Sequence, residues 1–240
     1  MAKELIDFDR EWAAILASAK GDNKGADAAK TQDYFVRHGR YTAGTATHYR
    51  PSILTAEGSH QHLAKGFAIG TRFHSAPVVR LSDAKPVHLG HVAKADGRFR
   101  LFLFAGAGDA AADGSPLRSL CDLLSESPKS PIRRHTPAGA DIDSVIDVRA
   151  VFQQAHTELA IEAMPALLLP RKGRYGLIDY EKMFCPDLRA AHDIFAMRGI
   201  DRQAGCMVVV RPDQFVAHVL PLDAHEELAA YFDGFMLRAA

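Results

Sequence analysis

The chain has 240 residues, of which 48% are hydrophobic and 24% are charged, and its 29 Lys and Arg residues balance 29 Asp and Glu residues. This composition is typical of a globular protein with a sizeable core, and nothing in the balanced charge points to nucleic acid or to an anionic membrane. No apolar run reaches the roughly 18 residues of a membrane-spanning helix, and the N-terminus is too acidic for a signal peptide. A cytoplasmic protein is therefore expected.

Residues 1–66 are expected to form a helix followed by an extended segment. Four apolar residues recur three or four positions apart and so share one helical face: Leu5, Phe8, Trp12 and Ile15. No good N-cap precedes them, and Phe8 and Trp12 need a partner surface, either from this chain or from a domain upstream of it. The small polar residues of 20–32 are typical of a linker, and residues 33–66 are predicted to be irregular.

Short strands are predicted from about residue 67 onward. They are Val78–Leu81, Val87–Leu89, Phe99–Phe104, Ser144–Val148, Cys206–Val210 and Phe215–Leu220. Phe99–Phe104 is apolar on both faces apart from Arg100, which is typical of a central strand. The last two strands form a hairpin with Pro212 at the second turn position. Residues 158–168 fit either a helix broken at Pro165 or a strand over residues 166–169.

Two helices complete the pattern. Ser115 is a good N-cap, Pro116 suits the first helical position, and Pro128 and Pro131 are expected to end this helix. The last helix is predicted over residues 224–237. The order of strand, helix, strand, hairpin and helix favours an α/β fold with a thioredoxin-like mixed sheet flanked by helices, preceded by a helical and irregular N-terminal extension.

A glycine pattern after the strong strand has the form G-x-G-x-x-A, from Gly106 to Ala111. A dinucleotide site needs a helix that opens at the last glycine, so that its N-terminus holds the pyrophosphate. Here the better helix start is Ser115, several residues further on. A loop is therefore favoured over a nucleotide site.

Other residues that could carry chemistry have simpler interpretations. The histidine pairs His60/His62 and His88/His91 lack the further converging ligands of a zinc site, so loop positions are favoured. Thioredoxin-type chemistry needs a thiolate at a helix N-terminus and a second thiol two residues on. The three cysteines are far apart without a CxxC pair, and only Cys121 lies on the helix, in its second turn, where it is expected to face the core. Reduced thiols are expected rather than disulfides.

Two further motifs carry no catalytic assignment. Gly58-Ser59-His60 lacks the strand–turn–helix frame of a serine nucleophile. The basic run Arg133–His135 is interpreted as a solvated face rather than an anion site.

Eight stretches in order carry a resemblance that is more specific than any of these motifs. They are LIDFDREW (5–12), GRYTAGTAT (39–47), RFHSAPVVR (72–80), DAKPVHLG (83–90), DGRFRL (96–101), DSVIDVR (143–149), GIDRQ (199–203) and VVVRPDQ (208–214). Over essentially all 240 residues the chain resembles the C-terminal third of flavin-dependent aromatic hydroxylases of the 3-hydroxybenzoate 4-monooxygenase type, and more loosely the related phenol 2-monooxygenases.

The resemblance implies that flavin chemistry and dimerisation lie in different regions of such a protein. Members of the family are larger flavoproteins that use FAD, NADPH and oxygen to hydroxylate a phenolic ring, and their FAD fold and substrate pocket lie N-terminal to this region. Residues 67–240 would then form a thioredoxin-like C-terminal dimerisation domain without redox cysteines. Residues 1–66 would continue from an absent flavin domain. No catalytic, cofactor-binding or metal-binding residue is carried over to this chain, and it is expected to bind no FAD alone.

Three functions follow as expectations. The first is a non-catalytic assembly part of an aromatic-ring monooxygenase, truncated or split from its FAD-binding half, which forms a homodimer and docks a FAD-binding domain on the Phe8/Trp12 helix. The second is a subunit that completes a flavin monooxygenase with a separately encoded FAD-binding chain. The third is a free-standing thioredoxin-like protein without dithiol activity. The ring substrate is not determined, because its pocket would lie elsewhere.

Overall fold

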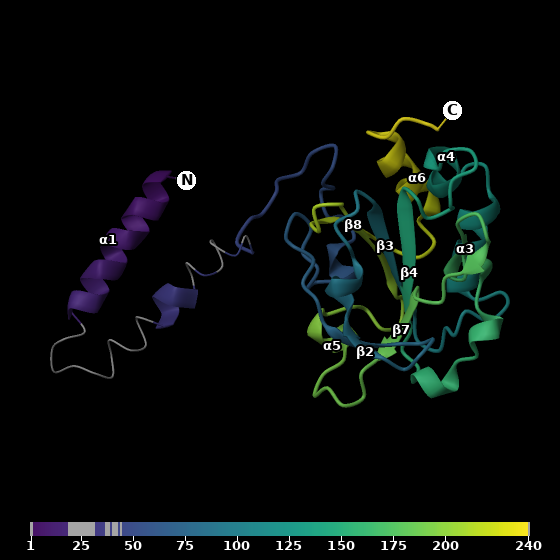
Figure 1. Ribbon diagram of the computed structural model, residues 1–240, viewed down its shortest axis with the longest axis horizontal. Helices are drawn as coiled ribbons and strands as arrows, with labels where there is room; N and C mark the ends of the chain where they lie inside the picture. Colours follow the sequence, from purple (N-terminus) through teal and green to yellow (C-terminus); the bar gives the residue numbers. More distant parts are fainter. Residues whose placement is uncertain (1, 19–31, 37–38, 40–42, 44, 240) are drawn as a thin grey trace. The chain divides into compact units, whose positions relative to one another are not determined.

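The computed structural model describes residues 2–18, 32–36, 39, 43 and 45–239 (Figure 1). The chain divides into two compact units, residues 1–48 and 49–240, and each is described by itself. The predicted linker, residues 20–32, lies outside the described residues apart from Gln32. The domain boundary at residue 67 stays a prediction, because a compact unit need not coincide with an independently folding domain.

The first unit is helical. Helix α1 (Ala2–Ser18) confirms the predicted helix, and residues 32–36 are also helical, where irregular structure was expected. The ring of Tyr34 stacks on Phe8 at 5.6 Å and on Trp12 at 6.0 Å, and the Tyr34 hydroxyl donates to the Phe8 carbonyl at 3.0 Å. Part of the partner surface for Phe8 and Trp12 is therefore supplied by this chain.

A seven-stranded mixed sheet forms the centre of the second unit, in the order β2-β1-β7-β4-β3-β8-β9. Its strands are β1 (Pro77–Arg80), β2 (Pro86–His88), β3 (Phe99–Phe104), β4 (Ile146–Val151), β7 (Met183–Pro186), β8 (Cys206–Val210) and β9 (Val216–Leu220). Strand β3 is parallel to β4 and antiparallel to β8, so it is an interior strand, as its apolar sequence predicts. A separate hairpin joins β5 (Arg171–Lys172) to β6 (Leu177–Ile178).

The connections confirm the thioredoxin-like α/β arrangement. Strand β3, helix α3 and strand β4 form a βαβ unit, and the β8–β9 hairpin and helix α6 follow it. The helices of this unit are α3 (Pro116–Glu126), α4 (Pro131–His135), α5 (Ile194–Met197) and α6 (His225–Asp233). The Ser115 side chain caps α3 by accepting from the Arg118 N–H at 3.3 Å. Pro131, expected to end this helix, instead begins α4, where Ser130 is the N-cap.

Side chains of β3 alternate between two cores on opposite faces of the sheet. Leu101 and Leu103 pack with α3 and α6, whereas Phe102 and Phe104 pack with α5 and with residues from 63 to 93. Figure 1 shows α3 and α4 on one side of the sheet and α5 on the other. All four side chains are fully buried, so each face of β3 contributes to hydrophobic stabilisation.

Two parts of the second unit differ from the predictions. Residues 158–168 contain neither a broken α-helix nor a strand, but short 3-10 turns: η3 (His156–Glu158), η4 (Ile161–Ala163) and η5 (Ala166–Leu168). Strand β7 was not predicted, because its four residues end in a proline and are too short for a clear alternating pattern. Beside the sheet, η1 (Gln61–Leu63) and η2 (Leu89–Val92) are further 3-10 turns.

Candidate functional site

The carboxyl end of β3 and the N-terminus of α3 are where an α/β sheet of this kind would hold a ligand or a reactive thiolate. Asp109 occupies this position. Its carboxylate accepts hydrogen bonds from the backbone N–H groups of Ala111 at 2.8 Å and Leu117 at 2.9 Å, and the residue is 7% exposed. The chain's own carboxylate therefore takes the anion position of the helix. A crevice of about 250 Å³ lies beside it, between Gly106 and Gln203.

The three cysteines are free and fully buried. Burial raises the pKa of Cys185 to about 12 and raises the pKa values of Cys121 and Cys206 as well. The thiolate is the reactive form, so none of these thiols is activated for redox exchange. Cys121 faces the core from the second turn of α3, which confirms the prediction for its position.

Each of the two close histidine pairs brings two imidazole rings near one another. The ring centroids are 6.4 Å apart for His60 and His62 and 5.5 Å apart for His88 and His91. His60 Nε2 lies 3.1 Å from a Glu227 carboxylate oxygen. Among the described residues, no group of three or more His, Cys, Asp or Glu side chains is placed to hold a metal ion.

The helices of the described residues are also too short or too polar to span a lipid bilayer.

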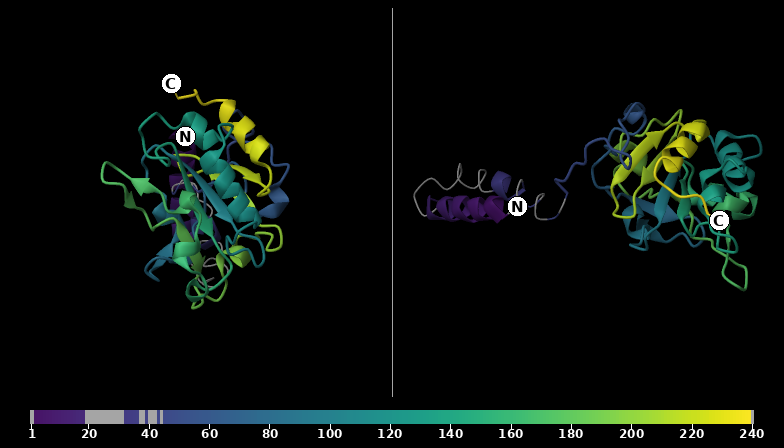
Figure 2. Two further views of the ribbon diagram at one scale, coloured as in Figure 1. Left: turned by 90° about the vertical axis from the view of Figure 1, so that its right-hand side faces the viewer. Right: turned by 90° about the horizontal axis from the view of Figure 1, so that it is seen from above.

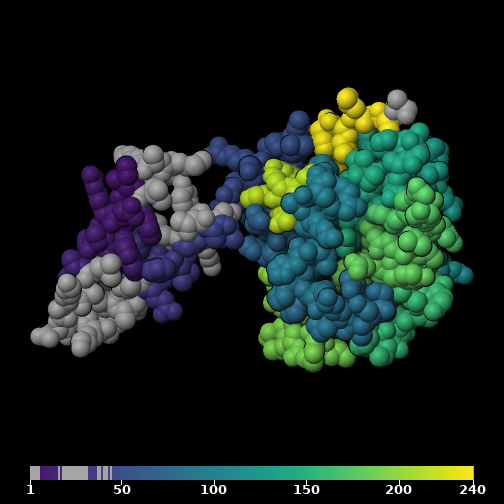
Figure 3. Space-filling model, viewed as in Figure 1, coloured from purple at the N-terminus to yellow at the C-terminus, as the bar shows by residue number. Residues whose placement is uncertain are grey.

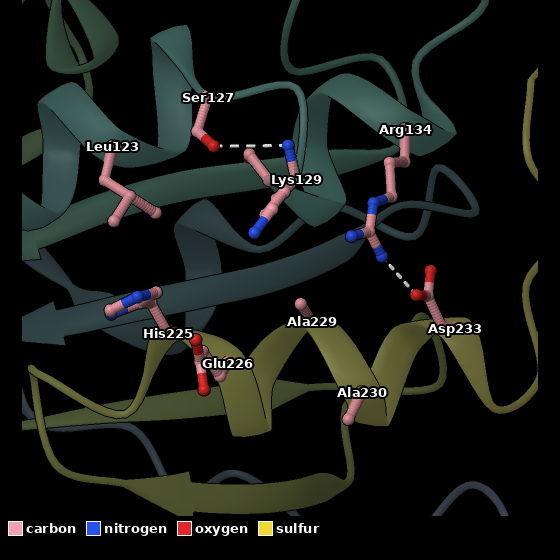
Figure 4. A pocket seen from close by; sticks show the side chains of 10 residues that line it. Leu123, Ser127, Lys129, Arg134, His225, Glu226, Ala229, Ala230 and Asp233 are labelled. Carbon is pink, nitrogen blue, oxygen red and sulfur yellow. Dashed lines mark hydrogen bonds and ion pairs between the residues drawn. The ribbon is translucent and has the colours of Figure 1, made fainter.

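A groove of about 470 Å³ runs between α3, α4 and α6 (Figure 4). Its lining residues are Leu123, Ser127, Lys129, Ser130, Arg134, His225, Glu226, Ala229, Ala230 and Asp233. Both serines are engaged with backbone: Ser127 Oγ accepts from the Lys129 N–H at 3.2 Å, and Ser130 Oγ donates to the Leu124 carbonyl at 2.6 Å. They act as caps and turn residues, and the groove presents mixed charge rather than a catalytic arrangement.

The basic run Arg133–His135 in α4 was predicted to be a solvated face, and the structure agrees only in part. Arg133 is exposed, but Arg134 pairs with Asp233 of α6. His135 is 4% exposed, and its Nδ1 lies 2.9 Å from the Leu237 carbonyl oxygen. The interpretation as a solvated face is therefore wrong for His135, because the C-terminal segment covers it.

A buried cluster of charged residues was missed by the sequence analysis. Lys182 is 1% exposed and its ammonium lies 2.5 Å from Asp143, 2.6 Å from Asp147 and 3.3 Å from Asp179. Arg100, 2% exposed, lies 3.0 Å from Asp147, its cross-strand partner in β4. The sequence did contain a signal for this cluster: Arg100 and Asp147 stand inside the otherwise apolar strands β3 and β4. A charge that is buried in such a strand requires a partner of opposite sign.

The charges of this cluster perturb its carboxyl groups. Burial raises the pKa of Asp143, but the ammonium groups of Lys172 and Lys182 outweigh burial and lower it to about 2. Hydrogen bonds from Arg98 and Arg100 likewise outweigh burial at Asp96 and hold its pKa well below the usual range. Every charge of the cluster is paired with an opposite one, which is the pattern of a structural network rather than of a catalytic acid or base.

Exposed apolar side chains are the remaining candidate sites for contact with other proteins. In the first unit Ile6, Phe35 and Val36 are each more than half exposed. In the second unit the β5–β6 hairpin carries Tyr175, 74% exposed, and Leu177, 69% exposed. Exposed apolar groups that gather on one element mark contact surfaces more often than scattered ones do.

Curated relatives match almost the whole chain. It is 59% identical over 239 residues to 3-hydroxybenzoate 4-monooxygenase of Comamonas testosteroni and 34% identical to the FAD-dependent monooxygenase terD of Aspergillus terreus, in each case over 98% of this chain. The alignments cover 37% and 40% of those proteins. The chain therefore spans well under half the length of the relatives it matches.

Solved structures with a similar fold are more distant. A thiol peroxidase from Chromobacterium violaceum matches 68% of this chain and 86% of its own, with a TM-score of 0.39 and 13% identity. A mitochondrial 2-Cys peroxiredoxin from Plasmodium falciparum matches 68% of this chain and 90% of its own, with a TM-score of 0.37 and 9% identity.

The family is shown by a sequence model that covers residues 47–240, which include the whole sheet and its helices. That model describes the phenol hydroxylase C-terminal dimerisation domain. The match agrees with the resemblance that the eight sequence stretches indicate. The chain therefore belongs to the phenol hydroxylase C-terminal dimerisation domain family.

Proposed function

We propose that this chain is the non-catalytic, homodimer-forming part of a FAD-dependent aromatic-ring monooxygenase. The observation that carries the proposal is the family match over residues 47–240, together with relatives that are monooxygenases of more than twice the matched length. The hydroxylation itself, with FAD as cofactor and NADPH as reductant, would belong to the rest of such a protein.

The geometry of the described residues supports a scaffold role. The helix N-terminus that could hold an anion is filled by Asp109, and the three thiols are buried with raised pKa values. The buried ionisable groups Lys182 and Asp143 lie in a paired network. We therefore assign no catalytic, cofactor-binding or metal-binding residue to this chain. Its three reduced thiols suit a cytoplasmic location.

A FAD-binding domain would dock on the first unit. None of the side chains described in α1 and residues 32–36 is fully buried, and Ile6, Phe35 and Val36 are largely exposed. Two helices without a fully buried side chain bury too little apolar surface to be stable alone, so a partner that covers these exposed residues would stabilise them. The FAD-binding domain could lie upstream in the same polypeptide or in a separate chain. The second arrangement is our alternative function, a subunit that completes a flavin monooxygenase.

Mass and flavin content of the 240-residue chain test the proposal. Light scattering is expected to give twice the 26.2 kDa chain mass, and the protein is expected to be colourless and to take up no FAD from an equimolar solution. Addition of a FAD-binding chain that generates hydroxylase activity would select the subunit function. A monomer, or turnover of a hydroxybenzoate by this chain with only FAD and NADPH, would contradict the proposal.

A further inference from the structure

The β5–β6 hairpin has the composition of a protein contact. Tyr175, Leu177 and Tyr180 are all exposed and lie within six residues, and the Arg174 guanidinium lies over the Tyr175 ring at 4.6 Å. Tyrosine and arginine, with tryptophan, are enriched among the residues that dominate binding energy at interfaces. Figure 2 shows the green hairpin standing out from the rest of the second unit, and its residues reach the molecular surface in Figure 3.

The hairpin is held rigidly at its base. The Lys172 ammonium contacts both carboxylate oxygens of Asp143 at 2.6 Å, and the Gly173 N–H donates to Asp141 at 2.8 Å. The Asp179 N–H donates to the Pro170 carbonyl at 2.9 Å and closes the loop. A preformed arm loses little conformational entropy when it binds, so its exposed side chains contribute more to affinity.

The exposed tip carries charges of both signs. Arg171 and Arg174 are exposed, and neither makes an ion pair with any carboxylate of the described residues. Asp141 lies against the turn through its bond to Gly173 and is partly exposed. We call Asp141 and residues 171–177 the hairpin patch. Since the patch contains both arginines and a carboxylate around an apolar centre, a two-fold axis can bring an arginine of each copy to the carboxylate of the other.

We propose that the hairpin patch is a contact between two copies of this chain, in which the hairpins meet across a two-fold axis. Tyr175 and Leu177 form its apolar centre, and Arg174 of one copy faces Asp141 of the other. The inference rests on the proposed function as a dimerisation domain and adds to it the surface that pairs.

Two exposed leucines allow a matched test by sedimentation equilibrium on the full 240-residue chain. Leu177→Glu, at a position 69% exposed, is expected to raise the dimer dissociation constant at least about 100-fold, because it buries a charge at the centre of the contact. Leu188→Glu, at a position 74% exposed outside the patch, is expected to leave the constant unchanged. Arg174→Glu replaces the cation that faces Asp141 of the other copy by a second carboxylate and is expected to weaken the dimer in the same direction.

Cross-linking tests the two-fold geometry. Because Cys121, Cys185 and Cys206 are fully buried, a new surface cysteine is the accessible thiol in the chain. Tyr175→Cys is expected to form a disulfide-linked dimer on mild oxidation, with two thiols losing two electrons and two protons to the added oxidant. Leu188→Cys is expected to stay monomeric on a denaturing gel.

The outcomes separate the two claims. If the wild-type chain and Leu177→Glu are equally dimeric, the patch is not the contact, although the dimerisation function stands. If Leu177→Glu dissociates but Tyr175→Cys does not cross-link, the hairpins do not meet at a two-fold axis, and the inference is overturned. A wild-type chain that is monomeric at tens of micromolar overturns the dimerisation function and the inference with it.

Discussion

The carboxylate of Asp109 accepts a hydrogen bond at 2.9 Å from the backbone N–H of Leu117 in the first turn of α3. This bond fills, from within the chain, the position at which a thioredoxin-like fold presents its reactive group. The same carboxylate accepts from the Ala111 N–H at 2.8 Å, where Ala111 has a left-handed φ of 57°. One side chain thus shapes the loop and caps the helix.

Replacement of Asp109 is expected to destabilise the second unit. Asp109→Ala leaves two buried N–H groups without an acceptor and is expected to lower the free energy of unfolding by about 2–4 kcal/mol. Asp109→Asn keeps one acceptor oxygen and is expected to cost about half as much. Asp113→Ala, at a fully exposed position in the same loop, serves as the control, with a change of less than about 0.5 kcal/mol in urea denaturation. Equal losses for Asp109→Ala and Asp113→Ala would contradict the capping role.

The buried charge network is expected to respond strongly to loss of its central cation. Lys182→Met removes the buried cation that joins Asp143 to Asp147. Arg100 still pairs with Asp147, so the free energy of unfolding is expected to fall by about 3 kcal/mol, the lower end of the loss for breaking a buried ion pair. Lys172→Met is the matched control. Its side chain is 29% exposed and its ammonium pairs with Asp143, so the expected loss is about 1 kcal/mol. Chemical denaturation of both variants measures the difference, and equal losses would show that burial does not decide the effect.

The lowered pKa of Asp143 predicts a loss of stability in acid. The carboxyl titrates at about 2 in the folded chain and at about 4 in the unfolded chain, so the unfolded chain takes up its proton first. The stabilisation that the ionised Asp143 contributes is complete above about pH 4 and is lost as the pH falls from about 4 to about 2. The free energy of unfolding measured across pH 7 to 2 should show this fall. Asp143→Asn should lower stability at pH 7 and flatten the curve below pH 4, and parallel curves would contradict the assignment.

The buried thiols are expected to be unreactive in the folded chain. Cys121, Cys185 and Cys206 have raised pKa values and no exposed surface, so a thiol-specific reagent such as DTNB should label none of them rapidly at pH 8. After unfolding in guanidinium chloride, three thiols per chain should react. The folded protein should also fail to reduce insulin disulfides. Rapid reaction of one thiol in the folded chain would contradict the buried arrangement.

The first unit is expected to unfold before the second. Trp12 is the single tryptophan of the chain, and it packs on Tyr34 and, edge to face at 4.8 Å, on Phe35, so its fluorescence reports on the first unit. The described side chains of the unit are not fully buried, whereas the second unit contains two large cores. The fluorescence transition in urea should precede the far-ultraviolet circular dichroism transition. Coincident transitions would show that the two units unfold together.

Binding of a FAD-binding chain should change this order. If the partner covers Ile6, Phe35 and Val36, the fluorescence transition should move to higher urea concentration, and the dichroism transition should change less. Phe35→Ser is expected to weaken that shift. Met197→Ser, at an exposed position of the second unit, is the control.

Local sequence was sufficient for most of the secondary structure. Alternation and apolar runs predicted β3, β8 and β9, and Ser115-Pro116 predicted the start of α3, because these signals depend on neighbours within a few positions. Short elements were missed where the pattern was too brief, as in β7, or where a proline could either end or begin a helix, as at Pro131.

The sequence by itself determined the family and the thioredoxin-like order of strands and helices, because these depend on local periodicity and on stretches of recognisable residues. Tertiary structure alone decided which distant residues meet. Lys182 lies 35 positions from Asp147, and Asp109 reaches Leu117 only because the intervening loop folds back. Such contacts depend on strand pairing and on the cost of leaving a charge or an N–H group buried without a partner, which no local pattern records.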